Sequence, residues 1–84
     1  MQKEYFLSEL LPKQRATVKQ ILSHNTMKRR LQDLGFVKGS FVECVFSASS
    51  GDPICYRVGE TLLALRKQDA DTILVTKGRY FYEK

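Results

Sequence analysis

Residues 25–36 read NTMKRRLQDLGF, and this stretch decides the first element of the fold. It opens with two residues that suit the N-cap of a helix, Asn25 and Thr26. Apolar residues then recur three and four positions apart, which is the spacing of one helical face: Met27, Leu31 and Leu34. The sequence therefore predicts a short helix over residues 27–34.

The expected end of this helix is marked by Gly35. Helices commonly stop at a residue in the left-handed conformation, which glycine adopts without steric cost. Phe36 at the next position can then cover Leu31, as in a Schellman motif. We therefore expect the chain to turn sharply after Leu34.

Short strands are expected on both sides of the helix. Residues 15–22 contain no glycine or proline, and their imperfect alternation predicts a first strand with a bulge. Four later apolar runs are bounded by turn residues and predict further strands: 41–46, 54–58, 61–65 and 72–75. Before them, residues 5–11 end at Pro12 and predict a short helical turn or tight loop with Ser8 as its cap.

About five short strands and one brief helix predict an all-β fold, a small barrel in which closure protects the strand edges. The chain has 84 residues, which suffices for one domain and one core, so residues 1–84 are assigned to a single domain. The residues expected in this core are Leu31, Leu34, Val42, Ile54, Leu63, Leu65 and Ile73.

The composition is that of a folded protein with an excess of positive charge. Apolar residues make up 43% and charged residues 27%, and no run approaches the length of a membrane helix. The first residues lack the apolar segment of a secretory signal, so we expect a cytoplasmic location and free, buried thiols at Cys44 and Cys55. The net charge of +5 favours an acidic protein surface, nucleic acid or an anionic membrane face as partner.

The sequence offers no set of residues typical of catalysis or metal binding. His24 is the single histidine, and Asp52 is interpreted as a turn former whose carboxylate bonds nearby amides. No glycine-rich phosphate loop is present. The soft ligands Cys44, Cys55 and His24 lack the pair spacing of a metal site. We therefore expect no enzyme activity, no cofactor and no intrinsic metal.

A basic cluster on the expected helix is the first candidate binding surface. Arg29 points away from the apolar face and can pair with Asp33 one turn later, which is also how an ordinary solvated face looks. As a functional surface it would meet an acidic partner beside apolar side chains. The residues predicted to bind a partner are Lys28, Arg29, Arg30, Phe36 and Val37.

The aromatic end of the chain is the second candidate. Tyr80, Phe81 and Tyr82 can cover the open end of the barrel against Tyr5 and Phe6, or form a secondary docking patch. The sequence leaves both interpretations open.

Four stretches, in this order and spacing, resemble the FeoA family of small SH3-like barrels associated with bacterial ferrous-iron uptake. They are LSELLP at 7–12, RLQDLGF with Gly39 at 30–39, SGDPI at 50–54 and LALRKQDADTILV at 63–75. The chain departs from the family pattern at two loops. Lys13 and Gln14 stand where the family usually has a glycine, so that turn must differ in type or tolerate strain, and Ser49 replaces a proline.

The resemblance implies an accessory role in ferrous-iron transport, with the cytoplasmic G-protein region of the FeoB permease as partner. A related implication is an arginine lent to that GTPase, for which the candidates are Arg29, Arg30, Arg57 and Arg66. The same barrel resembles the C-terminal domain of iron-dependent repressors. A nucleic-acid-binding barrel is the alternative, favoured by charge but lacking interleaved exposed aromatics.

Overall fold

The structure, a computed structural model, describes residues 3–77. Within them six strands form one antiparallel sheet in the order β1-β6-β2-β3-β4-β5. The strands are Lys3–Phe6 (β1), Arg15–Ile21 (β2), Phe41–Ser47 (β3), Ile54–Val58 (β4), Thr61–Leu65 (β5) and Ile73–Lys77 (β6). Three short helical elements connect them: the 3-10 helix Leu7–Glu9 (η1) and the α-helices Asn25–Asp33 (α1) and Lys67–Ala70 (α2).

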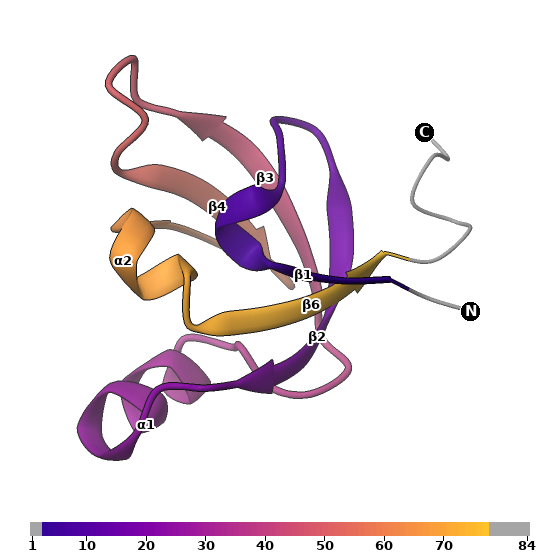
Figure 1. The fold of residues 1–84 in the computed structure, drawn as a ribbon, viewed down its shortest axis with the longest axis vertical. Helices are drawn as coiled ribbons and strands as arrows, with labels where there is room; N and C mark the ends of the chain where they lie inside the picture. The colour runs from indigo at the N-terminus through magenta and orange to yellow at the C-terminus, as the bar shows by residue number, and fades with distance from the viewer. Residues whose placement is uncertain (1–2, 78–84) are drawn as a thin grey trace.

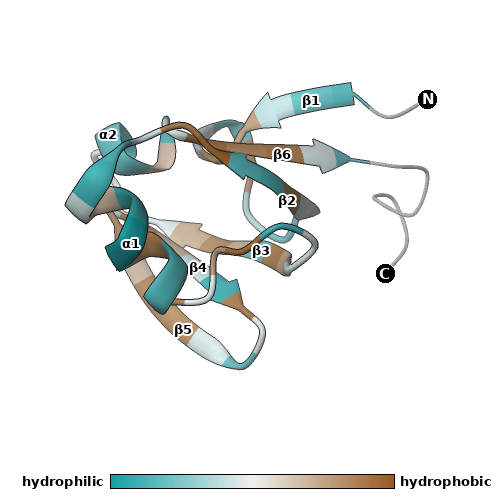
Figure 2. Ribbon diagram, turned by 90° about the horizontal axis from the view of Figure 1, so that it is seen from below, coloured by the Kyte–Doolittle hydropathy of each residue, from teal (hydrophilic) through white to brown (hydrophobic). Residues whose placement is uncertain are grey.

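The sheet bends over a single core. Figure 2 shows β1, β6 and β2 on one side and β3, β4 and β5 on the other, with α1 and α2 together at one end. Side chains from both halves fill the space between them, including Val18 and Val75 from one half and Val42 and Tyr56 from the other. Figure 1 shows the two short helices, η1 directly after β1 and α2 directly before β6. The predicted all-β, SH3-like fold with a short helix after its first long strand is confirmed. The predicted closure is wrong, because β1 and β5 stay at the two edges of the sheet and do not pair with each other.

The strand predictions are confirmed except at the start of the chain. All five predicted strands are present, and β2 carries the expected irregularity, a shift of register between Val18 and Gln20. β1 was not predicted because KEYF is short and half charged, and it forms only by pairing with β6. The polar segment between β5 and β6 contains α2, a helix of a single turn that was not predicted. In the described residues 3–77, no helix is long and apolar enough to cross a membrane.

The start of α1 differs from the prediction by a few residues. His24 occupies the N-cap with an extended backbone, and no side chain caps the helix by a hydrogen bond. Asn25 is already helical by its hydrogen bonding and has a φ of +55°, a left-handed value that asparagine tolerates. The predicted caps Asn25 and Thr26 are therefore wrong, since both lie inside the helix.

The end of α1 is the predicted Schellman motif. Gly35 has a φ of +114°, and its N–H donates to the carbonyl oxygen of Gln32 at 3.0 Å. The N–H of Phe36 donates to the carbonyl oxygen of Leu31 at 3.1 Å. A Cβ atom at position 35 would lie 3.0 Å from Val58 Cγ1, so packing as well as φ favours glycine there.

The predicted core is confirmed at most positions and wrong at one. Leu31, Val42, Ile54, Leu65 and Ile73 are buried, and Leu63 is partly buried against them. Leu34 is 36% exposed, because α1 ends there and the chain turns back. The turn carries Phe36 into the core beside Leu31 instead.

A tight turn at residues 11–14 leads into β2. The N–H of Gln14 donates to the carbonyl oxygen of Leu11 at 2.9 Å, and Lys13 has a φ of +77°. The turn is fastened to β3, since the N–H of Lys13 donates to the carbonyl oxygen of Cys44 at 2.6 Å. A lysine thus occupies a turn position that ordinarily favours glycine.

Candidate functional site

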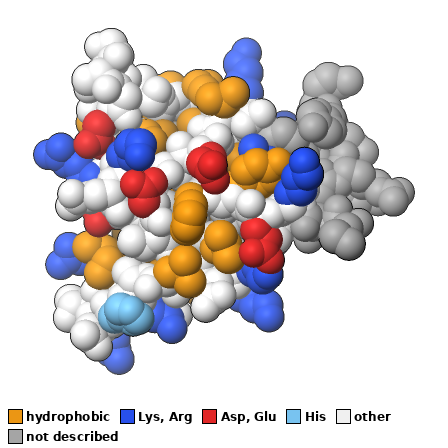
Figure 3. All heavy atoms as spheres, viewed as in Figure 1, with side chains coloured by type: hydrophobic (Ala, Val, Ile, Leu, Met, Phe, Trp, Pro, Cys, Tyr) orange, Lys and Arg blue, Asp and Glu red, His pale blue; other side chains and the backbone are white. Residues whose placement is uncertain are grey.

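The basic cluster predicted from the sequence lies on the exposed side of α1. Lys28, Arg29 and Arg30 are all exposed, and none of them takes part in an ion pair found among residues 3–77. The predicted pair between Arg29 and Asp33 is likewise not formed. Figure 3 shows blue Lys and Arg side chains around the pale-blue histidine, at the end of the molecule where Figure 1 places α1. These charges are solvated and available to an external anion.

Phe36 has to be removed from the predicted partner surface. Its side chain is fully buried, because the Schellman motif directs it into the core. Two other apolar side chains remain beside the cations, Val37 at 46% exposed and Leu34 at 36% exposed. Leu34 was not part of the predicted partner surface, because it was expected in the core together with Leu31.

We call the resulting set the helix surface. It combines three cations on α1 with two apolar side chains on either side of Gly35, a composition found at the rim and core of transient interfaces. Its members are Lys28, Arg29, Arg30, Leu34 and Val37.

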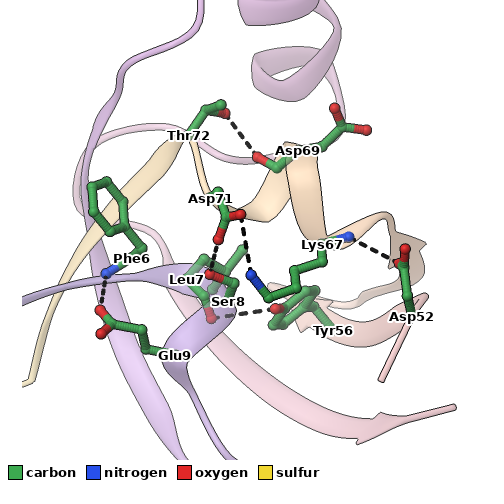
Figure 4. A network of polar contacts seen from close by, with 10 residues as sticks. All are labelled: Phe6, Leu7, Ser8, Glu9, Asp52, Tyr56, Lys67, Asp69, Asp71 and Thr72. Atoms are coloured by element: carbon green, nitrogen blue, oxygen red, sulfur yellow. Dashed lines mark hydrogen bonds and ion pairs between the residues drawn. The ribbon is translucent and has the colours of Figure 1, made fainter. Parts of the chain in front are cut away.

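A network of polar contacts joins η1, α2 and the loop before β4 (Figure 4). The carboxylate of Asp71 accepts hydrogen bonds from the hydroxyl of Ser8 and from Nζ of Lys67, the latter at 3.3 Å. Oδ1 of Asp52 accepts a hydrogen bond from the backbone N–H of Lys67 at 2.9 Å. Asp52 therefore ties its loop to the start of α2. Its carboxylate does bond a backbone amide, but that amide belongs to α2 and not to a residue nearby in the sequence.

The predicted cap at Ser8 is also wrong. Oε1 of Glu9 accepts the N–H of Phe6 at 2.7 Å at the start of η1, whereas the Ser8 side chain reaches Asp71. The hydrogen bond from Ser8, and then the nearby Lys67, lower the pKa of Asp71 below its ordinary value. Asp71 is exposed, so its hydrogen bonds hold η1 and α2 together at the surface of the protein.

Tyr56 anchors the same region from inside the core. Its side chain is fully buried, and its hydroxyl donates to the carbonyl oxygen of Leu7 at 3.2 Å. Burial raises the pKa of Tyr56 above its ordinary range, so the hydroxyl stays protonated and remains a donor. The hydrogen bonds of this network join η1, α2 and the loop before β4, so they hold three segments together.

The two cysteines lie on different faces of the sheet. Cys44 belongs to the core and lies opposite Tyr56 on β4, whereas Cys55 directly precedes Tyr56, lies opposite Phe46 and is not part of the core cluster, although it is also buried. Both thiols are free and buried, and burial raises the pKa of Cys44. His24 is exposed at the start of α1. Within residues 3–77, no three His, Cys, Asp or Glu side chains come together as a metal site.

The four arginines considered as donors to a GTPase differ in their surroundings. Arg57 pairs with Glu43 at 3.3 Å, and Arg66 lies 3.8 Å from Asp52. Arg29 and Arg30 have no such partner in the part of the chain that the structure describes. The helix surface therefore holds the two arginines that are least engaged elsewhere.

The secondary patch at Tyr80, Phe81 and Tyr82 lies outside the described residues. One of its proposed contacts, Tyr5, has Nζ of Lys77 at 3.8 Å from the centre of its ring, a cation–π arrangement.

These features define a class of protein: a small SH3-like β domain with a basic helix surface and no clustered catalytic or metal-binding side chains among residues 3–77. The family model of the FeoA domain matches residues 6–77, and the chain belongs to this family.

Solved structures and one characterised relative agree with this assignment. The FeoA protein of Chlorobium tepidum is 37% identical and superposes with a TM-score of 0.80, over 84% of this chain and 68% of that one. The FeoA of Stenotrophomonas maltophilia, an SH3 domain protein solved with zinc, is 35% identical with a TM-score of 0.74, over 89% and 88%.

The third relative is a fusion of Fe(2+) transport protein A with the Fe(2+) transporter FeoB, from Porphyromonas gingivalis. It is 32% identical over 69 residues, which is 82% of this chain and 8% of the fusion. The chain thus corresponds to a small part of that relative. The family is associated with ferrous-iron transport.

Proposed function

We propose that this domain is a non-catalytic, cytoplasmic accessory protein that binds the G-protein region of a FeoB-type ferrous-iron permease through the helix surface. The fusion protein of Porphyromonas gingivalis carries the proposal, because it joins a relative of this chain to a FeoB transporter. When two proteins are fused in one organism, their separate relatives in other organisms are good candidates for binding each other. The cytoplasmic location follows from the proposed partner region.

The electrostatics of the helix surface support an acidic partner. Lys28, Arg29 and Arg30 are exposed and form no ion pair among the described residues, so binding would not have to break an internal pair. The adjacent Leu34 and Val37 offer apolar contact that slows dissociation. Charge would steer the encounter, and the apolar pair would hold the complex.

The direct test measures binding of the full chain to the purified G-protein fragment of the permease at several salt concentrations. Arg29→Glu combined with Arg30→Glu should slow association about tenfold and flatten its salt dependence. Val37→Asp should mainly speed dissociation. Lys3→Glu is the matched control, because Lys3 is an exposed cation on β1, away from α1.

Three results would contradict the proposal in different ways. Binding that survives the double reversal but is lost on removing residues 80–84 would move the interface to the aromatic end. Binding of RNA or DNA with a steep salt dependence, without binding to the permease fragment, would favour the nucleic-acid function. A change in the fragment's GTP hydrolysis that disappears in Arg29→Ala or Arg30→Ala while binding of the fragment is retained would show that the domain is not a mere binding module and supplies an arginine to the reaction.

A further inference from the structure

The edge strand β5 lacks the usual protection of a sheet edge. It pairs with β4 on one side only, and its sequence TLLAL contains no charge and no proline. Leu62 is 56% exposed, and Ala64 is exposed beside it. The other edge, β1, carries Lys3 and Glu4, and Glu4 is further engaged by Lys19. Natural sheets normally block an edge by such charges, so an unblocked edge indicates a place for another strand.

Part of the outer face beside β5 is also apolar, although Leu62 itself lies next to the exposed Arg57 in the register of the sheet. Alternation along β5 places Leu62 and Ala64 on this face, whereas Leu63 and Leu65 face the core. In the register of the sheet Ala64 lies next to Cys55, and Cys55 lies next to Phe46, which is 57% exposed. Figure 2 shows β5 at the outer edge of the β3-β4-β5 half.

We propose that β5 pairs antiparallel with β5 of a second copy of this chain, centred on Leu63. In this register Leu62 lies opposite Ala64 of the second copy, and Ala64 lies opposite that copy's Leu62. A large side chain thus meets a small one on both sides of the two-fold axis. The two sheets become continuous, and each copy supplies the alternate N–H and C=O groups that β4 does not use.

Charge complementarity selects this register. Glu60 and Arg66 flank β5, and pairing centred on Leu63 places Glu60 of each copy opposite Arg66 of the other. Glu60, in the turn before β5, is exposed and forms no ion pair among residues 3–77. Arg66, the N-cap of α2, lies 3.8 Å from Asp52, but its side chain is 70% exposed and can also face Glu60 of a second copy. A shift of two residues in either direction removes both charge pairs. Opposite charges at both ends of an uncharged strand therefore fit a second copy of the same strand.

The outer apolar row is completed by the same pairing. Leu62 of one copy then lies in the same row as Ala64, Cys55 and Phe46 of the second copy. Leu62 thereby acquires apolar neighbours in place of solvent, which an isolated chain does not provide. The proposed contact is separate from the helix surface on α1, so either can hold if the other fails.

Sedimentation velocity of the full chain, in a concentration series up to about 1 mM, tests the proposal. The wild-type chain should form a dimer that Leu62→Lys weakens tenfold or more, because the lysine places two charges in the pairing. Phe41→Lys is the matched control, since Phe41 is 76% exposed on β3, in the same half of the sheet but away from β5. A chain that stays monomeric throughout the series would overturn the proposal. So would a dimer that Phe41→Lys dissociates and Leu62→Lys does not.

A charge exchange tests the register. Glu60→Arg and Arg66→Glu should each weaken the dimer about tenfold, because each turns two attractive pairs into two repulsive ones. The double variant should restore the wild-type dissociation constant. Asp33→Arg controls for the change in net charge, since Asp33 lies at the end of α1. A double variant no better than either single one would show that Glu60 and Arg66 do not meet.

Discussion

Replacing Lys13 by glycine should make the domain more stable, although it removes a whole side chain. Lys13 holds a φ of +77° in the turn between η1 and β2 and is exposed. Its backbone N–H bonds the carbonyl oxygen of Cys44 at 2.6 Å, so the turn is held in this conformation by β3. Glycine can keep this hydrogen bond and removes the Cβ atom that strains the turn.

The expected gain follows from two opposing terms. A residue with a Cβ atom in the left-handed conformation lowers the free energy of unfolding by about 1–2 kcal/mol. A glycine in turn lowers the free energy of unfolding by about 0.5–1 kcal/mol, because the unfolded chain is more flexible at a glycine. The difference is a stabilisation of about 0.5–1 kcal/mol, which for a domain of this size raises the melting temperature by about 2 to 8 °C.

Thermal and urea unfolding of three variants separates the backbone effect from other causes. Lys13→Ala removes the same charge but keeps the Cβ atom, so it should stay within about 0.5 kcal/mol of wild type. Gln14→Gly adds a glycine at the next position, where φ is not positive, and also removes the hydrogen bond that the N–H of Leu11 donates to Oε1 of Gln14 at 2.8 Å, so it should destabilise. If Lys13→Gly is no more stable than Lys13→Ala, the positive φ carries no strain and the reasoning is refuted.

Two further predictions concern packing and charge. Leu31→Ala should cost about 2–5 kcal/mol, whereas Leu34→Ala should cost about 1 kcal/mol or less, because Leu31 is 1% and Leu34 36% exposed; equal losses in urea unfolding would contradict this. Asp71→Asn should lower stability near neutral pH, since the hydrogen bond from Ser8 lowers the folded-state pKa of Asp71 below its ordinary value and the charged form is favoured by folding. That stability is present above the unfolded pKa and is lost as pH falls through the folded one, so the melting temperatures of the two proteins should converge below about pH 4; a constant gap down to about pH 2 would contradict the linkage.

The parts of the fold that were predictable depend on local chemistry. The end of α1 is one example, because Gly35 and the apolar residues around it specify the Schellman motif within six residues. The start of α1 was less predictable, since His24 caps the helix through its backbone and leaves no side-chain signal. β1 was not predictable from its own residues, because its pairing partner β6 is about 70 positions away along the chain.

The candidate site was predictable in its charges and not in its apolar part. Lys28, Arg29 and Arg30 are exposed because charged residues on a helix rarely leave water. Which apolar neighbour stays outside depends on how the turn after α1 closes on the sheet. The sequence shows Leu34, Phe36 and Val37 as three apolar residues, and only the packing separates the buried Phe36 from the exposed other two.

The residues that carry the family resemblance are mainly those that hold the fold together. Three of the four stretches, 7–12, 50–54 and 63–75, meet in the polar network through Ser8, Asp52 and Asp71. The fourth contains the Schellman motif at the end of α1. Family membership therefore identifies a scaffold, whereas recognition of a partner depends on side chains that the scaffold leaves in solvent. In this chain we propose the cations of α1 and the uncharged edge of β5 for this role, and because they lie on different elements, substitutions in one should leave the other's binding unchanged.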